Sequence, residues 1–319
     1  MYWMDSLKFE VFSYYIPFKT PLKLKGKTFA TRKGFILKHT DSKGRIGYGE
    51  VAPLPFFSKE SLQDAFTQLK EVIHAFKQKK SINFQKIFPS LAFGLTCSFI
   101  KELPEKISLS YSSLLLGSPQ EILKKISSTL TTSIKVKAHS LDLLETIDLF
   151  KELKKLYPDK KIRVDFNQSL SFKNAIQFCK SFQPTDFEFL EEPCITKQES
   201  LLLSKETQFP TVFDESLPTL KAEELPYIAG LVIKPTIVGN ISENAKNKPL
   251  IFSSSFESKV GIYHILRLAE KSSFYAPGID TSQFMEDNIT FSLFEQTQGK
   301  TIIEKPLLNT ENLCYVPLD

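Results

Sequence analysis

The chain of 319 residues carries 41 Lys and Arg against 36 Asp and Glu, and 42% of its residues are hydrophobic. That composition suffices for one large domain or two ordinary ones with sizeable cores. The net charge of +5 is spread along the chain, and the short basic runs at 77–80 and 159–163 are typical of solvated helix ends or loops. We therefore expect no nucleic-acid partner.

No apolar run approaches the length of a membrane span, and the first fifteen residues lack the apolar core of a signal peptide. The four cysteines form no CxxC pair and no zinc-binding spacing. We expect a soluble, cytoplasmic protein with free thiols and no membrane partner.

The N-terminal third predicts strands followed by a helix. Residues 8–51 contain aromatic-rich strand patterns and a hairpin whose polar turn is 41–44. Residues 58–80 form an amphipathic pattern with apolar residues at helical spacing, and Ser58 and Ser61 offer start signals. This part of the chain is therefore predicted to be α+β.

After about residue 107, short apolar runs alternate with helical patterns such as 141–157 and 172–182. The eight predicted strands are 111–117, 133–139, 161–168, 187–193, 210–216, 228–236, 249–258 and 273–280. Eight strand–helix units favour a closed parallel barrel over an open sheet.

Charged or polar residues end almost every one of these strands, about one strand–helix unit apart: Lys135 and Lys137, Asp165 and Asn167, Glu191 and Glu192, Asp214 and Glu215, Lys234, and 253–255. The carboxyl ends of barrel strands meet at one mouth, where active sites lie. We therefore expect these side chains to form a ring, with three acids between lysines.

Carboxylates from three successive strands suit a hard cation such as Mg²⁺, with Mn²⁺ as the alternative. Lys135 and Lys137 project side by side, since residues i and i+2 of a strand share a face. A second lysine, a third across the barrel and a dication each lower a lysine's pKa. A lysine brought toward neutrality can remove a proton next to a carboxylate.

These motifs resemble those of the enolase superfamily: "KVK" its KxK, "VDFN" its DxN, "LEEP" its ExP, "FDES" its DES and "VIKPT" its KPT. Within it, several stretches resemble the o-succinylbenzoate synthase family: "GYGEVAPLPFFSKESL", "RVDFNQSL", "EFLEEPC", "VIKPTIVG", "FSSSFESKVGIYH" and "APGIDT". The set taken together is specific, although each stretch alone is weak.

The resemblance implies an α/β fold, a modified TIM barrel of the (β/α)7β type with an N-terminal α+β capping domain. It places the capping domain at 1–105, joined by the C-terminal tail 300–319, and the barrel at 106–299. A capping loop at 18–26 would close over the site and exclude water.

Carried over residue by residue, the resemblance assigns Mg²⁺ to Asp165, Glu191 and Asp214. Lys137 would be the base, Lys135 would orient and tune it, and Lys234 would stabilise an enediolate from the opposite face, the pattern of a lysine base with magnesium. Substrate contacts or their support would come from Asn167, Arg163, Ser254, Ser255 and Gly278.

The implied reaction is the syn dehydration of a succinyl-bearing cyclohexadiene carboxylate in menaquinone biosynthesis, which makes the chain a lyase. The partner would be this small-molecule carboxylate. The sequence leaves the oligomeric state open, and a monomer is compatible with it.

Two alternatives stay open at this point. An N-acylamino-acid racemase or a dipeptide epimerase would use the same lysines, but the epimerases typically carry a DxD motif where this chain has the single Asp280. A non-catalytic barrel that serves as a binding protein predicts a lost lysine or ligand, and all six key groups are present.

Overall fold

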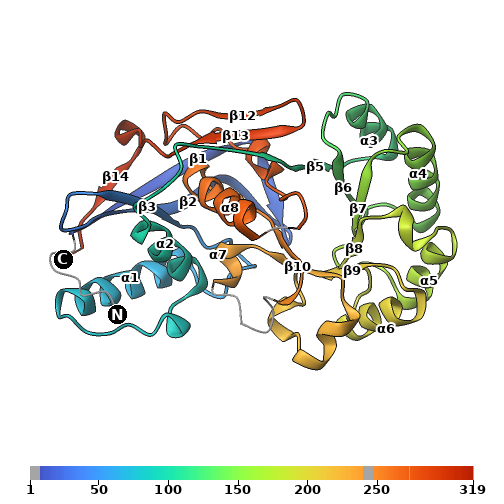
Figure 1. The fold of residues 1–319 in the computed structure, drawn as a ribbon, viewed down its shortest axis with the longest axis horizontal. Helices are drawn as coiled ribbons and strands as arrows, with labels where there is room; N and C mark the ends of the chain where they lie inside the picture. Colours follow the sequence, from blue (N-terminus) through green and yellow to red (C-terminus); the bar gives the residue numbers. More distant parts are fainter. Residues whose placement is uncertain (1–7, 240–246, 273, 319) are drawn as a thin grey trace.

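The computed structural model describes residues 8–239, 247–272 and 274–318. Its N-terminal part is an antiparallel sheet in the order β14-β1-β2-β3, which α1 and α2 accompany on the left of Figure 1. The elements are β1 (Lys8–Leu24), β2 (Lys27–Thr40), β3 (Ile46–Val51), α1 (Leu62–Lys77), α2 (Pro89–Phe99) and β14 (Cys314–Val316). We call this part the cap.

The predicted hairpin is confirmed, since β2 and β3 pair antiparallel across the turn at 41–44. The predicted helix is α1, which begins later than Ser58. Its N-cap is Ser61. The Ser61 side chain accepts a hydrogen bond from the Asp64 backbone amide, and the Asp64 carboxylate accepts one from the Ser61 backbone amide. This reciprocal capping box fixes the start.

The region predicted as a capping loop at 18–26 is the end of the β1–β2 hairpin. β1 runs to Leu24 with a register shift between Pro17 and Leu22, and β2 resumes at Lys27. The turn residues Lys25 and Gly26 both have positive φ. Backbone pairing of Leu22 with Phe29 therefore makes this segment a strand extension rather than an irregular loop.

The second sheet is parallel, in the sequential order β5 to β11. Its strands are β5 (Ser112–Leu115), β6 (Ser133–Lys137), β7 (Lys161–Asp165), β8 (Phe189–Glu191), β9 (Thr211–Phe213), β10 (Gly230–Ile233) and β11 (Leu250–Phe252). Each lies inside one of the runs predicted from the sequence.

An extended segment, 276–278, occupies the eighth position. Gly278 bridges Ser253 in parallel beyond β11, and the Ser112 amide at β5 donates to the Pro277 carbonyl at 3.0 Å. On the β11 side, the Gly278 amide also donates to the Phe252 carbonyl and the Ser254 amide to the Gly278 carbonyl, both at 2.8 Å, so backbone hydrogen bonds on both sides close the barrel. The predicted eighth strand, 273–280, includes residue 273, which lies outside the described residues, and its described part is not a regular strand.

Helices cover the outside of the barrel, and α3 to α6 line the right-hand edge of Figure 1. The helices are α3 (Pro119–Ile126), α4 (Leu143–Leu156), α5 (Phe172–Lys180), α6 (Lys197–Thr207), α7 (Pro235–Val238) and α8 (Lys259–Ser272). Two 3₁₀ helices, Leu217–Thr219 and Ala222–Tyr227, replace an α-helix between β9 and β10. The predicted modified barrel with an α+β cap is confirmed.

A third, small antiparallel sheet joins distant parts of the chain in the order β12-β13-β4. It contains β12 (Phe294–Thr297), β13 (Lys300–Glu304) and β4 (Lys106–Ser110). Beyond it, β14 pairs with β1 of the cap. The cap also packs on the barrel helices, α2 against α7 and β3 against α8.

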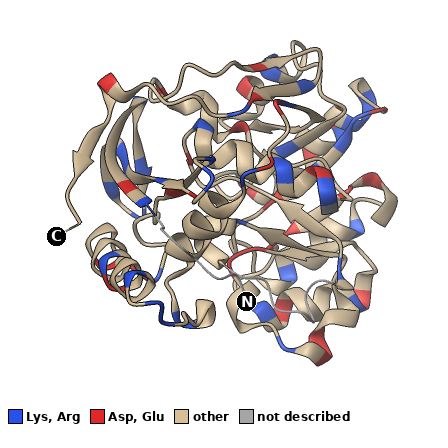
Figure 2. Cartoon of the chain, turned by 60° about the vertical axis from the view of Figure 1, so that its left-hand side comes forward, with Lys and Arg blue, Asp and Glu red and all other residues tan. Residues whose placement is uncertain are grey.

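Two apolar layers sandwich the barrel strands. Outward residues such as Ile134 and Val164 pack under the helices, and a smaller cluster of Phe189, Val212, Val232 and Ile251 fills the barrel interior. No helix in the described ranges has both the length and the apolar character of a membrane span. Basic and acidic segments are interspersed in the view of Figure 2.

Candidate active site

The alternation of side chains along each strand aims the polar residues into the barrel. In β6, Ile134 and Val136 are fully buried against the helices, so Lys135 and Lys137 point inward. In β7, Val164 faces outward and Asp165 inward. Strands β6 and β7 are neighbours in the sheet, and Lys137 lies opposite Asp165 in their register. The interior apolar cluster lies below these charges and closes the bottom of the site.

The two β6 lysines are held by carboxylates of the next strands. Lys135 Nζ lies 2.8 Å from Asp165 Oδ2 and 2.7 Å from both oxygens of Glu191. Lys137 Nζ lies 2.6 Å from Asp165 Oδ2 and donates to Asn167 Oδ1 at 2.8 Å. One aspartate therefore bridges both lysines, and Asn167 orients the second.

Across the barrel, the Lys234 ammonium forms an ion pair with Asp214 Oδ2. Lys234 directly follows β10, and Asp214 directly follows β9. The Asn167 amide nitrogen donates to Glu215 Oε1 at 3.0 Å, which ties the β7 end to the β9 end. Lysines from β6 and β10 thus stand on two sides of three carboxylates from β7, β8 and β9.

The charges shift one another's ionisation strongly. Burial lowers the pKa of Lys135, but Asp165 and Glu191 outweigh burial and raise it well above the ordinary value. Burial likewise lowers the pKa of Lys234, and Asp214 and Glu215 overcome it and raise that pKa. The mutual lowering expected from the sequence for adjacent lysines is thus outweighed at Lys135 by the carboxylates.

The carboxylates respond in opposite directions. Burial opposes ionisation of Asp165, yet Lys135 and Lys137 hold the pKa of that carboxyl far below its usual range. At Glu191, burial and then the repulsion from Asp165 raise the pKa above its usual value, with Asp214 adding to the rise. A site with mutually repelling buried carboxylates is one that a further cation would stabilise.

The donor set fits a divalent cation. The three acids are hard oxygen ligands on neighbouring strands, and the Lys135 ammonium already lies between two of them. In the part of the chain that the structure describes, however, no three acid, histidine or cysteine side chains are gathered closely enough to hold an ion. The ion pairs with the lysines account for this, because each acid is turned toward an ammonium group.

Glu191 and Glu192 have separate tasks. Glu191 faces Lys135, whereas the Glu192 carboxylate accepts from the Asp214 amide at 3.0 Å, the Ser216 amide at 2.6 Å and the Ser216 hydroxyl at 2.8 Å. Glu192 itself has a positive φ of 42°. It therefore fixes the backbone that carries Asp214 and does not face the interior charges.

Arg163 lies inside the barrel, two residues before Asp165 along β7. Its Nε donates to Glu188 Oε2 at 2.5 Å and one terminal nitrogen to the Ala276 carbonyl at 2.7 Å. Its guanidinium also stacks over Phe189. These contacts tie Arg163 to Glu188 and to the closing segment of the barrel.

The serines after β11 alternate in direction. Ser253 continues the inward parity of Ile251 and donates to the Gly278 carbonyl at 3.1 Å. The Ser254 hydroxyl contacts Thr281 at 2.5 Å, and the Ser255 hydroxyl donates to Glu257 at 2.5 Å. Both predicted serines thus use their hydroxyls within the protein, and their amides also donate, Ser254 to the Gly278 carbonyl at 2.8 Å and Ser255 to Glu257 at 2.5 Å.

Sequence reasoning placed Glu192, Glu215 and Ser253 among the strand-end residues of the ring but gave them no role, and it did not select Gln168. Period two counted from Ile251 would have selected Ser253. Asn167 and Gln168 both have positive φ, at 44° and 61°, and Gln168 Nε2 contacts Glu192 at 3.2 Å. Residues with strained backbone conformations are frequent at functional sites, but nothing in the sequence predicts a positive φ at a glutamine.

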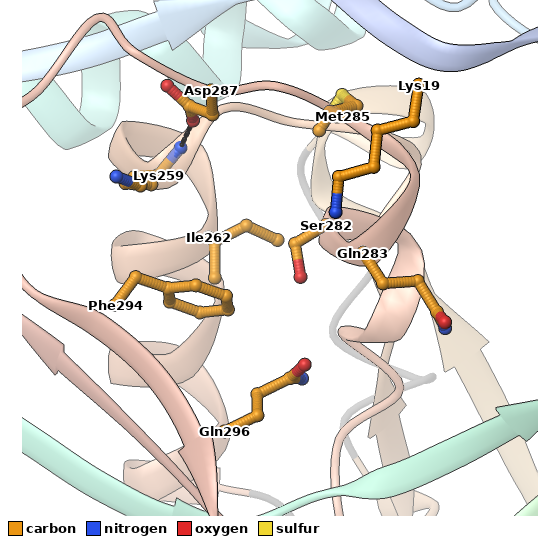
Figure 3. Close-up of a pocket in the computed structure, with 9 residues that line it drawn as sticks. All are labelled: Lys19, Lys259, Ile262, Ser282, Gln283, Met285, Asp287, Phe294 and Gln296. Carbon is orange, nitrogen blue, oxygen red and sulfur yellow. Dashed lines mark hydrogen bonds between the residues drawn. The ribbon is translucent and has the colours of Figure 1, made fainter.

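The described residues also line two cavities away from the lysines. One, of about 260 Å³, lies between β1, α8 and 282–296, and Lys19 and Gln296 point toward it (Figure 3). The other, of about 720 Å³, lies in the cap between residues 18–33 and 53–64. Neither is lined by a predicted metal ligand or by Lys135, Lys137 or Lys234.

Comparison with known proteins decides the family. The model described as "MenC, N-terminal domain" matches residues 6–102, and "Enolase C-terminal domain-like" matches 120–225. The o-succinylbenzoate synthase of Vibrio cholerae serotype O1 is 30% identical over 293 residues, 85% of this chain and 88% of its own. The chain belongs to the o-succinylbenzoate synthase family.

A second member of the o-succinylbenzoate synthase family, from Pasteurella multocida, is 28% identical and aligns over 98% of each chain. The family consists of lyases of the enolase superfamily. The function predicted from the motifs is thus confirmed at the level of the family, and the racemase and binding-protein alternatives are not favoured.

Solved structures share the fold. An o-succinylbenzoate synthase of Thermosynechococcus elongatus, complexed with Mg in its active site, matches with a TM-score of 0.71 at 20% identity over 88% of this chain and 93% of that one. The L-Ala-D/L-Glu epimerase of Bacillus subtilis matches with a TM-score of 0.75 at 17% identity over 98% and 100%. The fold therefore does not separate dehydration from epimerisation.

Proposed function

We propose that the chain catalyses the syn dehydration of 2-succinyl-6-hydroxy-2,4-cyclohexadiene-1-carboxylate to 2-succinylbenzoate, a step of menaquinone biosynthesis. One observation carries the proposal: in a chain of this family, lysines from β6 and β10 flank three carboxylates from β7, β8 and β9. The epimerase neighbour supports only the fold.

Lys137 is the base and removes the proton α to the ring carboxylate. Its position at the end of β6 and its bond to Asn167 hold the nitrogen in one place. Lys234, on the other side of the carboxylates, stays protonated and faces the negative charge that develops, because Asp214 and Glu215 raise its pKa after the opposing effect of burial. The Lys137 proton then goes to the departing hydroxyl, water leaves, and the ring becomes aromatic.

Asp165, Glu191 and Asp214 would hold a divalent cation, which we assign as Mg²⁺. When bound, this ion supplies positive charge opposite the substrate carboxylate. Lys135 and Lys137 both lie beside Asp165 and would be in competition with such an ion for the charge of that carboxylate. That competition is needed because a lysine that is ion-paired as an ammonium cannot accept a proton.

The succinyl carboxylate is assigned to the neighbourhood of Ser254, Ser255 and Gly278, with Ser253 beside them. Asn167 supports Lys137, and Arg163 supports the closing segment that carries Gly278. The division into a cap of 1–105 with the tail 300–319 and a barrel of 106–299 also stays a proposal, supported by the pairing of β14 with β1. The cytoplasmic location stays a prediction.

The test is a spectrophotometric assay with the cyclohexadiene substrate, with and without EDTA. We expect loss of diene absorbance that EDTA abolishes and Mg²⁺ restores. A folded, inactive protein that exchanges the Cα hydrogen of N-succinyl amino acids for deuterium would replace dehydration by racemisation. A folded protein that shows neither activity and no calorimetric Mg²⁺ binding would contradict the catalytic assignment as a whole.

A further inference from the structure

Two charged residues of the cap form hydrogen bonds with one segment of the barrel. Residues 253–258 follow β11 and precede α8, and they include the two serines assigned to the substrate carboxylate. Arg32 of β2 and Glu50 of β3 both bond to this segment, although more than 200 positions separate them from it in the chain. Both are buried, with 3% and 1% of their surface exposed.

The Arg32 guanidinium donates hydrogen bonds to carbonyl groups of both the cap and the barrel. Its Nε donates to the Phe256 carbonyl of the barrel segment at 3.0 Å. Its terminal nitrogens donate to the carbonyls of Pro53, at 2.8 Å, and of Ala52. A planar guanidinium directs its donors from three separate nitrogens in fixed directions, whereas all the donors of a lysine rotate about one nitrogen. Arg32 therefore sets the position of residue 256 relative to the cap.

Glu50 holds the other end of the same segment. Its carboxylate accepts from the Ser258 amide at 3.0 Å and hydroxyl at 2.8 Å, and from the Gly261 amide in the first turn of α8 at 2.8 Å. A Cβ at Gly261 would lie 2.3 Å from Glu50 Oε2, so only glycine admits the carboxylate. The cap thus supplies acceptors that the start of α8 lacks within the helix.

The backbone is strained at the residue that Arg32 holds. Phe256 has a φ of +63°, in the left-handed region that a bulky side chain avoids. Its ring packs edge-on against Phe18 of the cap, with centroids 5.7 Å apart. Such a conformation persists only where surrounding contacts impose it. Arg32 and Phe18 contact Phe256 directly, and Glu50 holds the backbone two residues further along.

We propose that Arg32 and Glu50 are positioning residues through which the cap shapes segment 253–258 to receive the substrate's side-chain carboxylate. The inference rests on the proposed function, because that function assigns the carboxylate to Ser254 and Ser255. Neither residue touches the lysines or the metal ligands, so their loss acts on recognition of the side chain and leaves the ion site intact.

The experiment compares Arg32→Met and Arg32→Lys with Lys33→Met, which removes an exposed cation from the neighbouring position of β2. Calorimetry in Mg²⁺ measures binding of 2-succinylbenzoate and of 2-propanoylbenzoate, which lacks the side-chain carboxylate. For the unmodified protein and Lys33→Met we expect clearly tighter binding of the succinyl compound. For Arg32→Met that preference shrinks at least tenfold, Arg32→Lys restores little of it, and Mg²⁺ affinity stays within twofold.

Glu50→Gln provides a second variant if Arg32→Met does not fold, with the same expected loss of preference. A folded variant at either position that keeps the full preference overturns the positioning role, whatever its melting temperature. An unmodified protein that binds both compounds equally well refutes the carboxylate assignment itself, and with it this inference. The two failures are therefore distinguishable.

Discussion

The Lys135 ammonium lies 2.7 Å from both carboxylate oxygens of Glu191 and 2.8 Å from Asp165. A cationic group thus already lies between two of the acids assigned to the metal. The negative charge of these carboxylates attracts the Lys135 ammonium and would also attract a divalent ion. The two cations would therefore compete for the same carboxylates. The competition yields a prediction that distinguishes Lys135 from Lys137.

Replacing Lys135 by Met should tighten Mg²⁺ binding while turnover falls. The ammonium repels a dication, and two unit charges at 4 Å interact by about 4 kcal/mol at an effective dielectric constant of 20. Screening by the carboxylates reduces this repulsion, so we expect the affinity for Mg²⁺ to increase roughly tenfold. Calorimetric titration measures it, and unchanged or weaker Mg²⁺ binding would contradict the competition.

Replacing Lys137 by Met should lower turnover by about 10² to 10⁴-fold, the usual contribution of a general base. The protein should stay folded and keep its Mg²⁺ site, because the replacement removes only the bonds to Asp165 and Asn167. Lys173→Met, on the exposed face of α5, is the matched control. A loss smaller than tenfold in the diene assay would remove Lys137 from the role of base.

Replacing Glu191 should affect Mg²⁺ binding, whereas replacing its neighbour Glu192 should affect stability. Glu191→Gln should abolish or greatly weaken Mg²⁺ binding in a folded protein, because one charged ligand is lost. Glu192→Ala should lower the free energy of unfolding by about 1–3 kcal/mol, since buried donors of residues 214 and 216 lose their acceptor. Urea unfolding and Mg²⁺ titration of both variants check the division, and equal behaviour in the two assays would argue against it.

His264 should make the fold sensitive to acid. Burial and the charge of Arg267 lower its pKa to about 3, and its Nε2 lies 2.9 Å from the Tyr48 carbonyl of the cap. Below its ordinary pKa of 6.5 the unfolded chain takes up a proton that the folded chain refuses, so this contribution to stability is present above pH 6.5 and is lost as the pH falls toward 3.

His264→Gln removes the titrating group and keeps a donor for the Tyr48 carbonyl. Between pH 4 and 6, the slope of the unfolding free energy against pH should fall by about 1.4 kcal/mol per unit relative to the unmodified protein. Urea unfolding at several pH values measures the slope. An identical slope in the two proteins would show that His264 is protonated in the folded state or does not contribute.

The sequence by itself determined the barrel, the order of its strands and the charged groups of the site. Period two places Lys135 and Lys137 on one face, and each polar residue that ends an apolar run marks the carboxyl end of a strand. These features are local, so a single run of residues carries them. The residue-level assignments at the serines depended on resemblance, and strict alternation would have favoured Ser253 over Ser254.

Only the tertiary structure decided the features that depend on contacts between distant residues. The eighth position of the barrel closes through Pro277 and Gly278 without a regular strand, which no local pattern indicates. The pKa of Lys135 rises because carboxylates from β7 and β8 converge on it, whereas its neighbours in the chain predicted the reverse. The bonds of Arg32 and Glu50 to residues 253–258 likewise exist only because folding brings β2 and β3 against the segment that leads into α8.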